Sequence, residues 1–204
     1  MVNIAQDHES PPSITAERPR NGARHQPGPS VVRDNAFSVT GRTATATRYV
    51  LAGIRLALGW VFLWAFLDKL FGFGRGTAAA SSWLDGGSPT AGFLGKAAAG
   101  PFAGFYHSIA GNVAVDVLFM AALLGIGVAL LLGIGMRIAA AAGGLLTVMM
   151  WTAVLPPDSN PFMDDHLVYA AVMVVLALLG AGTTLGFGIR WAAIPLVRRN
   201  TWLT

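Results

Sequence analysis

The chain has 204 residues, of which 54% are hydrophobic and 12% are charged, and its mean hydropathy is +0.57. Soluble globular domains carry about 25% charged residues, so this composition excludes an ordinary water-soluble domain and predicts an all-α membrane protein. The net charge of +4 comes without the dense basic runs of a nucleic-acid-binding surface, and the absence of cysteine excludes disulfides, CxxC redox motifs and thiolate metal sites within this chain.

Residues 1–47 are predicted to form a disordered cytoplasmic tail. This stretch has five prolines, scattered charges and no apolar period. It also lacks the positive, apolar and small-residue regions of a cleaved signal peptide. We therefore expect the first membrane span itself to direct the chain to the cell membrane.

The first apolar run, residues 49–71, is long enough to cross a bilayer and also carries charges. Arg55 lies inside it, and Asp68 and Lys69 lie near its end. Ionisable residues within membrane helices usually face a bundle interior or a watery cavity and often mark function. Arg55, Phe62 and Lys69 recur every seven residues and therefore share one helix face. Because Arg55 and Lys69 are about 21 Å apart along the axis, we place Arg55 in the inner half and Lys69 at the outer end.

Two interpretations of Arg55 stay open. Its long side chain could snorkel toward the cytoplasmic headgroups. Alternatively, it could face a polar interior or the head group of a quinone.

Residues 72–112 are predicted to form an outer loop with two short interfacial helices. Ser88 and Pro89 provide a cap and a proline start for a helix over residues 90–99. A second helix is indicated by an apolar stripe with helical spacing, formed by Phe102, Phe105, Tyr106 and Ile109.

Three further apolar runs are predicted to span the membrane, at residues 113–133, 137–155 and 166–188. Residues 133–137 leave room only for a tight helical hairpin between the second and third spans. Pro156 and Pro157 stop the third span. The expected fold is thus a four-helix membrane bundle. Small residues four apart predict close helix contacts, at Gly125, Ala129 and Gly133, at Ala139 and Gly143, and at Ala140 and Gly144.

The positions of lysine and arginine predict that both termini are cytoplasmic. Six arginines precede the first span, Arg137 lies in the hairpin, and three arginines follow the last span. Residues 156–165 contain three aspartates but no lysine or arginine. Arg75 and Lys96 in the outer loop are too few to reverse this bias. Residues 191–204 would then be a cytoplasmic C-terminal tail.

Polar residues are expected to gather in a mouth at the outer ends of the spans. Asp116 is the one acidic residue inside a later span, and its depth matches that of Asp68 and Lys69. Matched depth therefore allows an ion pair between Lys69 and Asp116. The depth of Arg55 excludes a pair between Arg55 and Asp116.

Two histidines outside the tail fall on the predicted outer side, His107 and His166. A histidine side chain exchanges a proton near neutral pH, which suits proton transfer at a quinone head group. The candidates for proton transfer are His107, Asp165 and His166. The candidates for binding a substrate or a quinone are Arg55, Phe62, Asp68, Lys69, Tyr106, Asp116 and Tyr169. Loop capping by the histidines is the alternative interpretation. A haem between them would require facing helices at matched depth, and we expect neither haem nor another metal.

The run of residues 55–69, RLALGWVFLWAFLDK, resembles the first helix of the DoxX family, which includes the DoxD-like small subunit of thiosulfate:quinone oxidoreductase. The resemblance covers about residues 48–190, the predicted membrane domain, and continues through residues 87–90, 100–107, 131–137 and 160–166. It implies a four-helix membrane subunit of a respiratory or redox complex. In the thiosulfate enzymes, two membrane subunits together oxidise thiosulfate to tetrathionate and pass electrons to quinone.

Three functions follow as hypotheses. The first is a quinone-linked oxidoreductase subunit, acting on thiosulfate or a related sulfur compound. Thiosulfate is a dianion, however, and unpaired aspartates at the outer mouth would repel it. These aspartates are Asp68, Asp116, Asp164 and Asp165. The second is a non-enzymatic membrane anchor for soluble redox or detoxifying proteins, and the third is a small-solute carrier that works as an oligomer. The expected partners are the lipid bilayer and either a second subunit or another copy of this chain, without nucleic acid.

Overall fold

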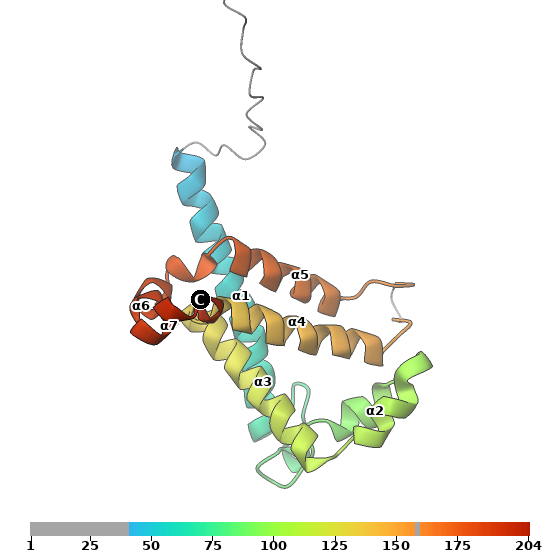
Figure 1. Cartoon of the computed structure of the whole chain (residues 1–204). Coiled ribbons are helices and arrows are strands. Elements are labelled where there is room, and N and C mark those ends of the chain that lie inside the picture. The colour runs from blue at the N-terminus through green and yellow to red at the C-terminus, as the bar shows by residue number, and fades with distance from the viewer. Residues whose placement is uncertain (1–40, 158–159) are drawn as a thin grey trace, which may run out of the picture. The chain divides into compact units, whose positions relative to one another are not determined.

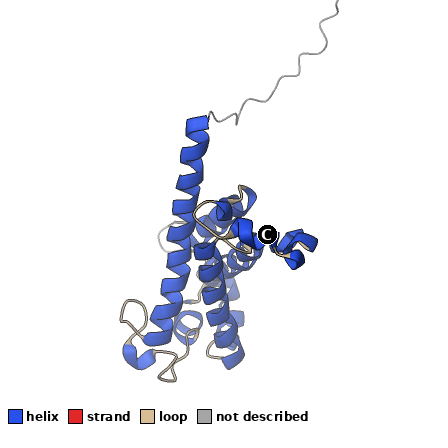
Figure 2. Ribbon diagram, turned by 90° about the vertical axis from the view of Figure 1, so that its left-hand side faces the viewer, coloured by secondary structure: helices blue, strands red, loops and turns tan. Residues whose placement is uncertain are grey.

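The structure, a computed structural model, describes residues 41–157 and 160–204. Within these ranges every regular element is an α-helix or a short 3₁₀ or π turn, which confirms the all-α prediction. Figure 2 shows these elements, with α1 as the long helix that extends beyond the others at its N-terminal end. The part of the predicted tail up to residue 40 lies outside the described residues.

The first helix, α1, runs from Gly41–Phe71, so it begins before the predicted span. The prediction that residues 41–47 belong to a disordered tail was therefore wrong. These residues are alanine, threonine, arginine and glycine, which can form a helix when it continues from an apolar segment but which show no apolar period. The helix ends at Gly72, whose left-handed φ of 69° lets its N–H donate to the Asp68 carbonyl at 2.8 Å.

Two further helices have spanning length. The helices α3, Val113–Leu132, and α4, Met136–Ala153, join α1 as the three described helices that are long and apolar enough to cross a membrane. The predicted tight hairpin between α3 and α4 is confirmed. Gly133 and Gly135 make this turn with φ values of 70° and 56°, which a residue with a side chain rarely adopts.

The predicted fourth span over residues 166–188 is not confirmed. Its helix, α5, covers only Asp165–Leu178 and is 14 residues long. At about 1.5 Å per residue it extends roughly 21 Å, which is shorter than the ~30 Å hydrocarbon core. Gly180 ends it with a left-handed φ of 62°. The chain then forms short helices, listed here in order: η5 Ala181–Thr183, α6 Gly188–Ala193, α7 Pro195–Arg199 and η6 Thr201–Leu203.

The predicted outer loop contains the two expected short helices in altered form. The second is α2, Ala103–Ile109, preceded by the 3₁₀ turn η4, Gly100–Phe102. The first shrinks to a five-residue π turn, η3, Phe93–Ala97, and a further 3₁₀ turn, η2, covers Ala79–Ser81. The Ala99 N–H donates to the Ala153 carbonyl at 2.8 Å and so joins this loop to the end of α4.

The helices pack as two neighbouring pairs, α1 with α3 and α4 with α5, and α3 also contacts α4 (Figure 1). Backbones approach closely at Gly59 on α1 and Gly127 on α3. A Cβ on Gly127 would lie 2.8 Å from the Leu63 nitrogen, whereas a Cβ on Gly125 would meet nothing within 4 Å. The apolar core between the pairs includes Leu58, Phe62, Met120, Leu123, Ile126, Leu130, Met173 and Leu176.

We call the end of these helices that carries residues 133–136 the hairpin end, and the end that carries residues 72–112 the loop end. The α3 helix runs from the loop end to the hairpin end, and α4 runs back. The α5 helix therefore begins near the loop end and finishes at the hairpin end. Arg55 lies level with the last turn of α3, and Asp116 lies in the first.

Candidate functional site

Arg55 is fully buried at the hairpin end. Its guanidinium donates hydrogen bonds to the carbonyls of Leu130 and Leu131, the latter at 2.9 Å, and both carbonyls belong to the last turn of α3. It also donates to the carbonyls of Thr184 at 3.2 Å and Leu185 at 2.8 Å, in the segment after α5. Since no part of the side chain reaches the surface, Arg55 does not snorkel but faces a polar interior.

Arg55 binds here because the last turn of α3 has backbone carbonyls that need hydrogen-bond donors. The last four carbonyls of an α-helix have no partner within the helix and form the negative end of its dipole. Here the Ala129 carbonyl accepts from the Gly133 N–H. The Arg55 guanidinium donates to the carbonyls of Leu130 and Leu131. The Phe187 N–H donates to the Leu132 carbonyl at 2.8 Å. Arg55 thus completes the pairing of a buried helix end.

Space for the guanidinium is made by glycines on both sides. A Cβ on Gly133 or on Gly186 would lie 3.2 Å from one of the two terminal nitrogens of Arg55. The Nε nitrogen is buried and is the one such side-chain nitrogen or oxygen among the described residues that lacks a hydrogen-bond partner. These contacts explain Arg55 as a structural tie between α1, α3 and residues 184–185.

Asp116 has a similar role at the loop end. Its buried Oδ1 accepts hydrogen bonds from the Ser88 hydroxyl at 2.9 Å, the Thr90 N–H at 3.1 Å and the Thr90 hydroxyl at 2.5 Å. These bonds fix the segment before η3 against the first turn of α3. No ion pair between Lys69 and Asp116 is found among residues 41–157 and 160–204, because Asp116 is bound to this loop instead.

Asp68 is buried and also binds the backbone of a loop. Its carboxylate accepts from the N–H groups of Arg75 at 3.2 Å and Gly76 at 2.9 Å. The adjacent Lys69 is partly buried, and its ammonium group makes no hydrogen bond or ion pair with a described residue, although its charge lies beside that of Asp68. The Asp68 carboxylate therefore closes the glycine-rich turn that follows α1.

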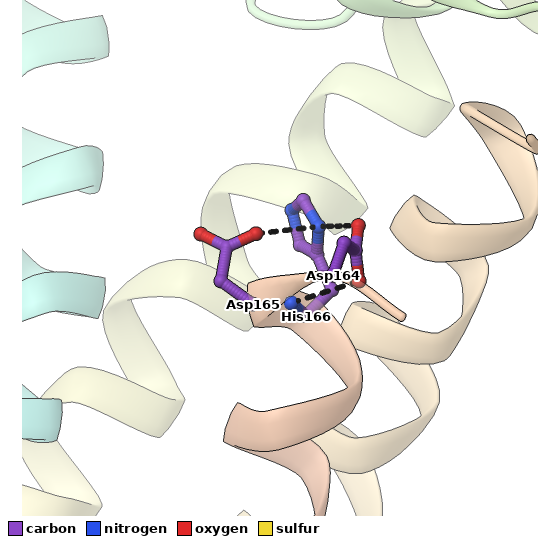
Figure 3. A group of neighbouring side chains, drawn as sticks. All are labelled: Asp164, Asp165 and His166. Carbon is purple, nitrogen blue, oxygen red and sulfur yellow. Dashed lines mark hydrogen bonds and ion pairs between the residues drawn. The ribbon is translucent and has the colours of Figure 1, made fainter. Parts of the chain in front are cut away.

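The second candidate group lies at the N-terminus of α5 (Figure 3). His166 Nδ1 is 2.7 Å from Asp164 Oδ2 and 3.4 Å from Asp165 Oδ1. Asp164 caps the helix, since its Oδ1 accepts from the N–H groups of His166 at 3.1 Å and Leu167 at 3.3 Å. Tyr169, one turn further, interacts with the Asp165 side chain. We call Asp164, Asp165 and His166 the α5 cluster.

The α5 cluster has one ligand atom from each residue within 4.8 Å of the others, a spacing that could hold a metal ion. Its three members are consecutive, and the bond between Asp164 and His166 already occupies two of the three ligand positions. The capping role of Asp164 accounts for the arrangement. What remains for chemistry is a partly buried imidazole held between two carboxylates, which can accept or release a proton.

Two residues of the loop, Tyr106 and His107, were also predicted to lie at the outer mouth. Tyr106 is buried, and its hydroxyl lies 3.0 Å from the Met149 carbonyl and 2.6 Å from the Thr152 hydroxyl on α4. His107 Nε2 is 3.2 Å from the Ala98 carbonyl. Within the described part of the chain no hydrogen bond joins either residue to the α5 cluster. The predicted single mouth is therefore divided among separate contacts.

Sequence reasoning did not predict that Ser88 and Thr90 bind Asp116 or that Thr152 binds Tyr106. A signal was present for the first two, because hydroxyl residues flank Pro89 in a loop next to a helix with one acidic residue. Thr152 gave no such signal. Phe62, predicted to hold a quinone, is buried in the core between α1 and α3.

A cavity of about 260 Å³ lies between α3, α4 and the loop, and we call it the loop-end cavity. The side chains of Leu118 and Leu145 on its wall are 71% and 64% exposed, so the cavity opens to the lipid-facing side of these helices. Thr90 and Tyr106 bring hydroxyls to its wall, both already bonded. Its other lining residues are Pro89, Phe93, Leu94, Ile109, Val115, Phe119, Ala122, Ala142, Leu146, Met149 and Met150.

The chain matches no protein-family model, no curated protein and no solved structure. The DoxX resemblance consequently stays a prediction. The features on which a function can be argued are the α5 cluster, the loop-end cavity and the three spanning helices.

Proposed function

We propose that this chain is a DoxX-type membrane subunit of a quinone-linked redox complex and that the loop-end cavity binds the quinone. The observation that supports the proposal is the cavity itself, which is apolar and opens between two helices of spanning length. A quinone dissolved in the bilayer would reach such a site sideways, without crossing the polar surface. A quinone supplies the capacity to take up two electrons and two protons.

The residues that line the cavity fit an apolar ligand. Its volume of about 260 Å³ is close to the lower end of small-ligand sites, roughly 300 Å³, so it would hold the ring and the first part of an isoprenoid chain, with the remainder in the bilayer. Phe93 and Phe119 offer aromatic faces, and Met149 and Met150 offer adaptable thioethers. The described residues that line the cavity are all uncharged.

In this proposal the sulfur compound is oxidised on a second subunit. Asp68 and Asp116 are buried and bound by N–H and hydroxyl donors of the loops. Asp164 and Asp165 flank His166, and although Asp164 also caps α5, the two carboxylates would repel a dianion such as thiosulfate. The α5 cluster instead suits proton exchange with water at the membrane surface. The chain would thus contribute the quinone site and a proton-exchanging group.

The distribution of arginines supports the orientation in the membrane that we propose, with the hairpin end in the cytoplasm. Arg137, Arg190, Arg198 and Arg199 all lie at or beyond the hairpin end. By the positive-inside rule this end faces the cytoplasm. The α5 helix together with residues 179–188 would then complete a fourth crossing, with both termini cytoplasmic.

Filling the cavity tests the proposed quinone site. Ala122 on α3 lines the cavity, whereas the exposed neighbour Ala121 does not. We expect Ala122→Phe to bind quinone about tenfold more weakly, because the ring would occupy the ligand's space. The measurement is the quinone retained by protein purified from native membranes in mild detergent, followed by titration with added quinone. Ala121→Phe is the matched control and should retain wild-type binding.

The proposal fails if wild-type protein neither retains nor binds quinone. Equal binding by Ala122→Phe and Ala121→Phe would place the quinone elsewhere. Assays of sulfur-dependent quinone reduction, with and without the proteins that co-purify, then test the link to a second subunit. His166→Gln should slow this turnover while leaving the affinity for quinone unchanged.

A non-enzymatic membrane anchor is the second candidate, and the buried charges favour it. Arg55, Asp68 and Asp116 are all bonded to backbone or loop groups, so they are explained by the fold alone. An anchor would co-purify with a soluble redox protein but would show neither quinone binding nor loss of activity in Ala122→Phe. The same purification therefore separates the two functions.

A further inference from the structure

The last part of the chain forms a surface that combines arginines with large apolar side chains. Ile189, Leu196 and Trp202 are 68%, 65% and 62% exposed, respectively. Three arginines are interleaved with them in the sequence and are exposed as well, Arg190, Arg198 and Arg199. Residues 188–203 consist of the short helices α6, α7 and η6, and we call this stretch the C-terminal segment.

The C-terminal segment is folded onto the hairpin end (Figure 1). Val197 is buried, and the Trp191 indole N–H donates to the Leu203 carbonyl at 2.7 Å. Arg137, at the start of α4, donates through its side chain to the Thr201 carbonyl at 3.2 Å. The exposed arginines and apolar side chains are therefore held on an ordered surface that continues to Arg137.

Within residues 41–157 and 160–204, no acidic side chain forms an ion pair with these arginines. Residues 166–204 and 117–157 contain no aspartate or glutamate, so the whole hairpin end after α1 is basic. Among the described residues the ion pairs involve His166 and its neighbours, and none involves these arginines. Arg190 lies over the Phe187 ring at 5.6 Å, and its side chain donates no hydrogen bond to another described residue. The surface lacks an anionic partner within the described chain.

A cavity of about 240 Å³ opens beside the C-terminal segment. Arg137, Thr183 and Trp191 contribute to its wall, together with a backbone rich in glycine, including Gly180 and Gly182. The Arg137 guanidinium uses one of its five N–H donors, for Thr201, so the others are available to an anion. Arginine, tryptophan and an open backbone form a wall suited to a phosphate group.

We propose that the C-terminal segment and Arg137 bind the headgroups of anionic phospholipids. The phosphates would lie against Arg137, Arg190, Arg198 and Arg199, while Ile189, Leu196 and Trp202 enter the boundary between headgroups and acyl chains. Arginines interleaved with exposed apolar and tryptophan side chains are typical of segments that lie in a membrane interface. A soluble acidic protein would satisfy the arginines but would leave these apolar side chains in water.

Lipid selectivity tests the proposal on the full-length protein. The protein is reconstituted in phosphatidylcholine vesicles, and electron paramagnetic resonance measures how strongly spin-labelled phosphatidylglycerol is preferred over spin-labelled phosphatidylcholine at its surface. Each basic residue near a membrane strengthens the attraction of anionic lipid by up to about fivefold. We expect a clear preference in the wild type that R190Q/R198Q/R199Q lowers by about fivefold or more. The corresponding triple lysine variant should keep the preference.

Arg75→Gln is the control at the loop end, since Arg75 is a single exposed arginine outside the C-terminal segment, and its loss should change the selectivity far less than the triple substitution. High salt should weaken the wild-type preference, because ions screen exposed charges. If the glutamine variant does not fold, the lysine variant and the salt titration still decide the result. Equal association of the two lipids with wild-type protein would overturn the proposal, as would unchanged selectivity in a folded glutamine variant. Binding of an acidic soluble protein without any lipid preference would also overturn it.

Discussion

Arg55 and Asp116 lie at opposite ends of α3, and each carries the charge that the helix dipole favours at its end. A helix end inside a membrane protein must find partners for its free backbone groups, because hydrocarbon offers none. At the negative end of the helix dipole the cation Arg55 takes the carbonyls, and at the positive end the anion Asp116 holds the loop. Each charge is thus matched to the dipole as well as to its hydrogen-bond partners.

Removing Arg55 should destabilise the protein more than it affects ligand binding. Arg55→Met would leave the carbonyls of Leu130, Leu131, Thr184 and Leu185 without their donor. We expect a loss of about 3 kcal/mol in the free energy of unfolding and a Tm lower by about 5–10 °C. Thermal unfolding in detergent, followed by circular dichroism, measures this.

Arg55→Lys is the matched variant for that experiment. Lysine keeps the charge but has three donors at one point instead of a planar fork, so its Tm should lie between those of the wild type and Arg55→Met. A normal Tm for Arg55→Met together with lost quinone binding would instead show that Arg55 contacts the ligand.

Asp116→Ala should loosen the loop. The change removes the acceptor for Ser88 and for both donors of Thr90. We expect a destabilisation of about 2 kcal/mol and faster cleavage within residues 77–112 by protease added to the purified protein. Asp116→Asn keeps an acceptor oxygen and should have a smaller effect. Equal cleavage of Asp116→Ala and the wild type would contradict the anchoring role.

At the residue scale, the sequence correctly separated Arg55 from Asp116 by depth. It could not reveal the partners of Arg55, because these are backbone carbonyls, which every residue has. Asp116 was predicted to face Lys69 because their opposite charges can be seen in the sequence. Its actual partners are hydroxyls of Ser88 and Thr90, and only the fold brings these to Asp116.

At the scale of the helices, some local sequence signals were sufficient to predict where an element lies, and others were not. Long apolar runs predicted α1, α3 and α4, and the glycine pair predicted the turn between α3 and α4. The predicted end of the fourth span lay too far along the chain, because the apolar residues Leu185 and Phe187 continue the run past Gly180, where a left-handed φ already ends the helix. Glycine in a membrane segment can either pack a helix or end it, and its local sequence does not decide which.

The contact between α1 and α3 depends on Gly127 rather than on the predicted Gly125. A Cβ on Gly127 would lie 2.8 Å from the nitrogen and 3.0 Å from the Cα of Leu63, and backbone cannot move aside easily. Gly127→Val should therefore destabilise the protein by about 1–3 kcal/mol.

Gly125→Val provides the control on the same helix. Its new side chain would have open space, so we expect a change within about 0.5 kcal/mol. Thermal unfolding of the two variants in one detergent gives the comparison. Equal destabilisation would mean that valine disturbs α3 itself and not its contact with α1.

For the whole molecule, sequence gave the helical class but not the way in which polar groups are distributed. The residues predicted to form one mouth came from α1, α2, α3 and α5. Depth along each helix could be estimated at about 1.5 Å per residue, but rotation about each axis could not. Asp68 and Asp116 consequently turn toward their own loops, and Tyr106 turns toward α4.

The orientation in the membrane can be tested cleanly because the chain has no cysteine. Single cysteines at the exposed positions Ser81 and Thr201 would report the loop end and the hairpin end. We expect an impermeant maleimide to label Ser81→Cys in intact cells and Thr201→Cys only after the cells are opened. The reverse pattern would show that the termini lie outside the cytoplasm, and labelling of both in intact cells would contradict a fourth crossing.

The contacts of Arg55 also determine when its hydrogen bonds can form during synthesis of the chain. The ribosome must add 75 residues after Arg55 before its first carbonyl partner exists, and 130 before Leu185 follows. Throughout that interval the nascent first helix carries an unpaired cation, which the insertion machinery or surrounding water must accommodate. A chain that stops before residue 184 would leave the guanidinium only partly bonded. An unfinished copy would therefore differ from a completed one by a cation within its first helix that lacks part of its hydrogen-bond partners.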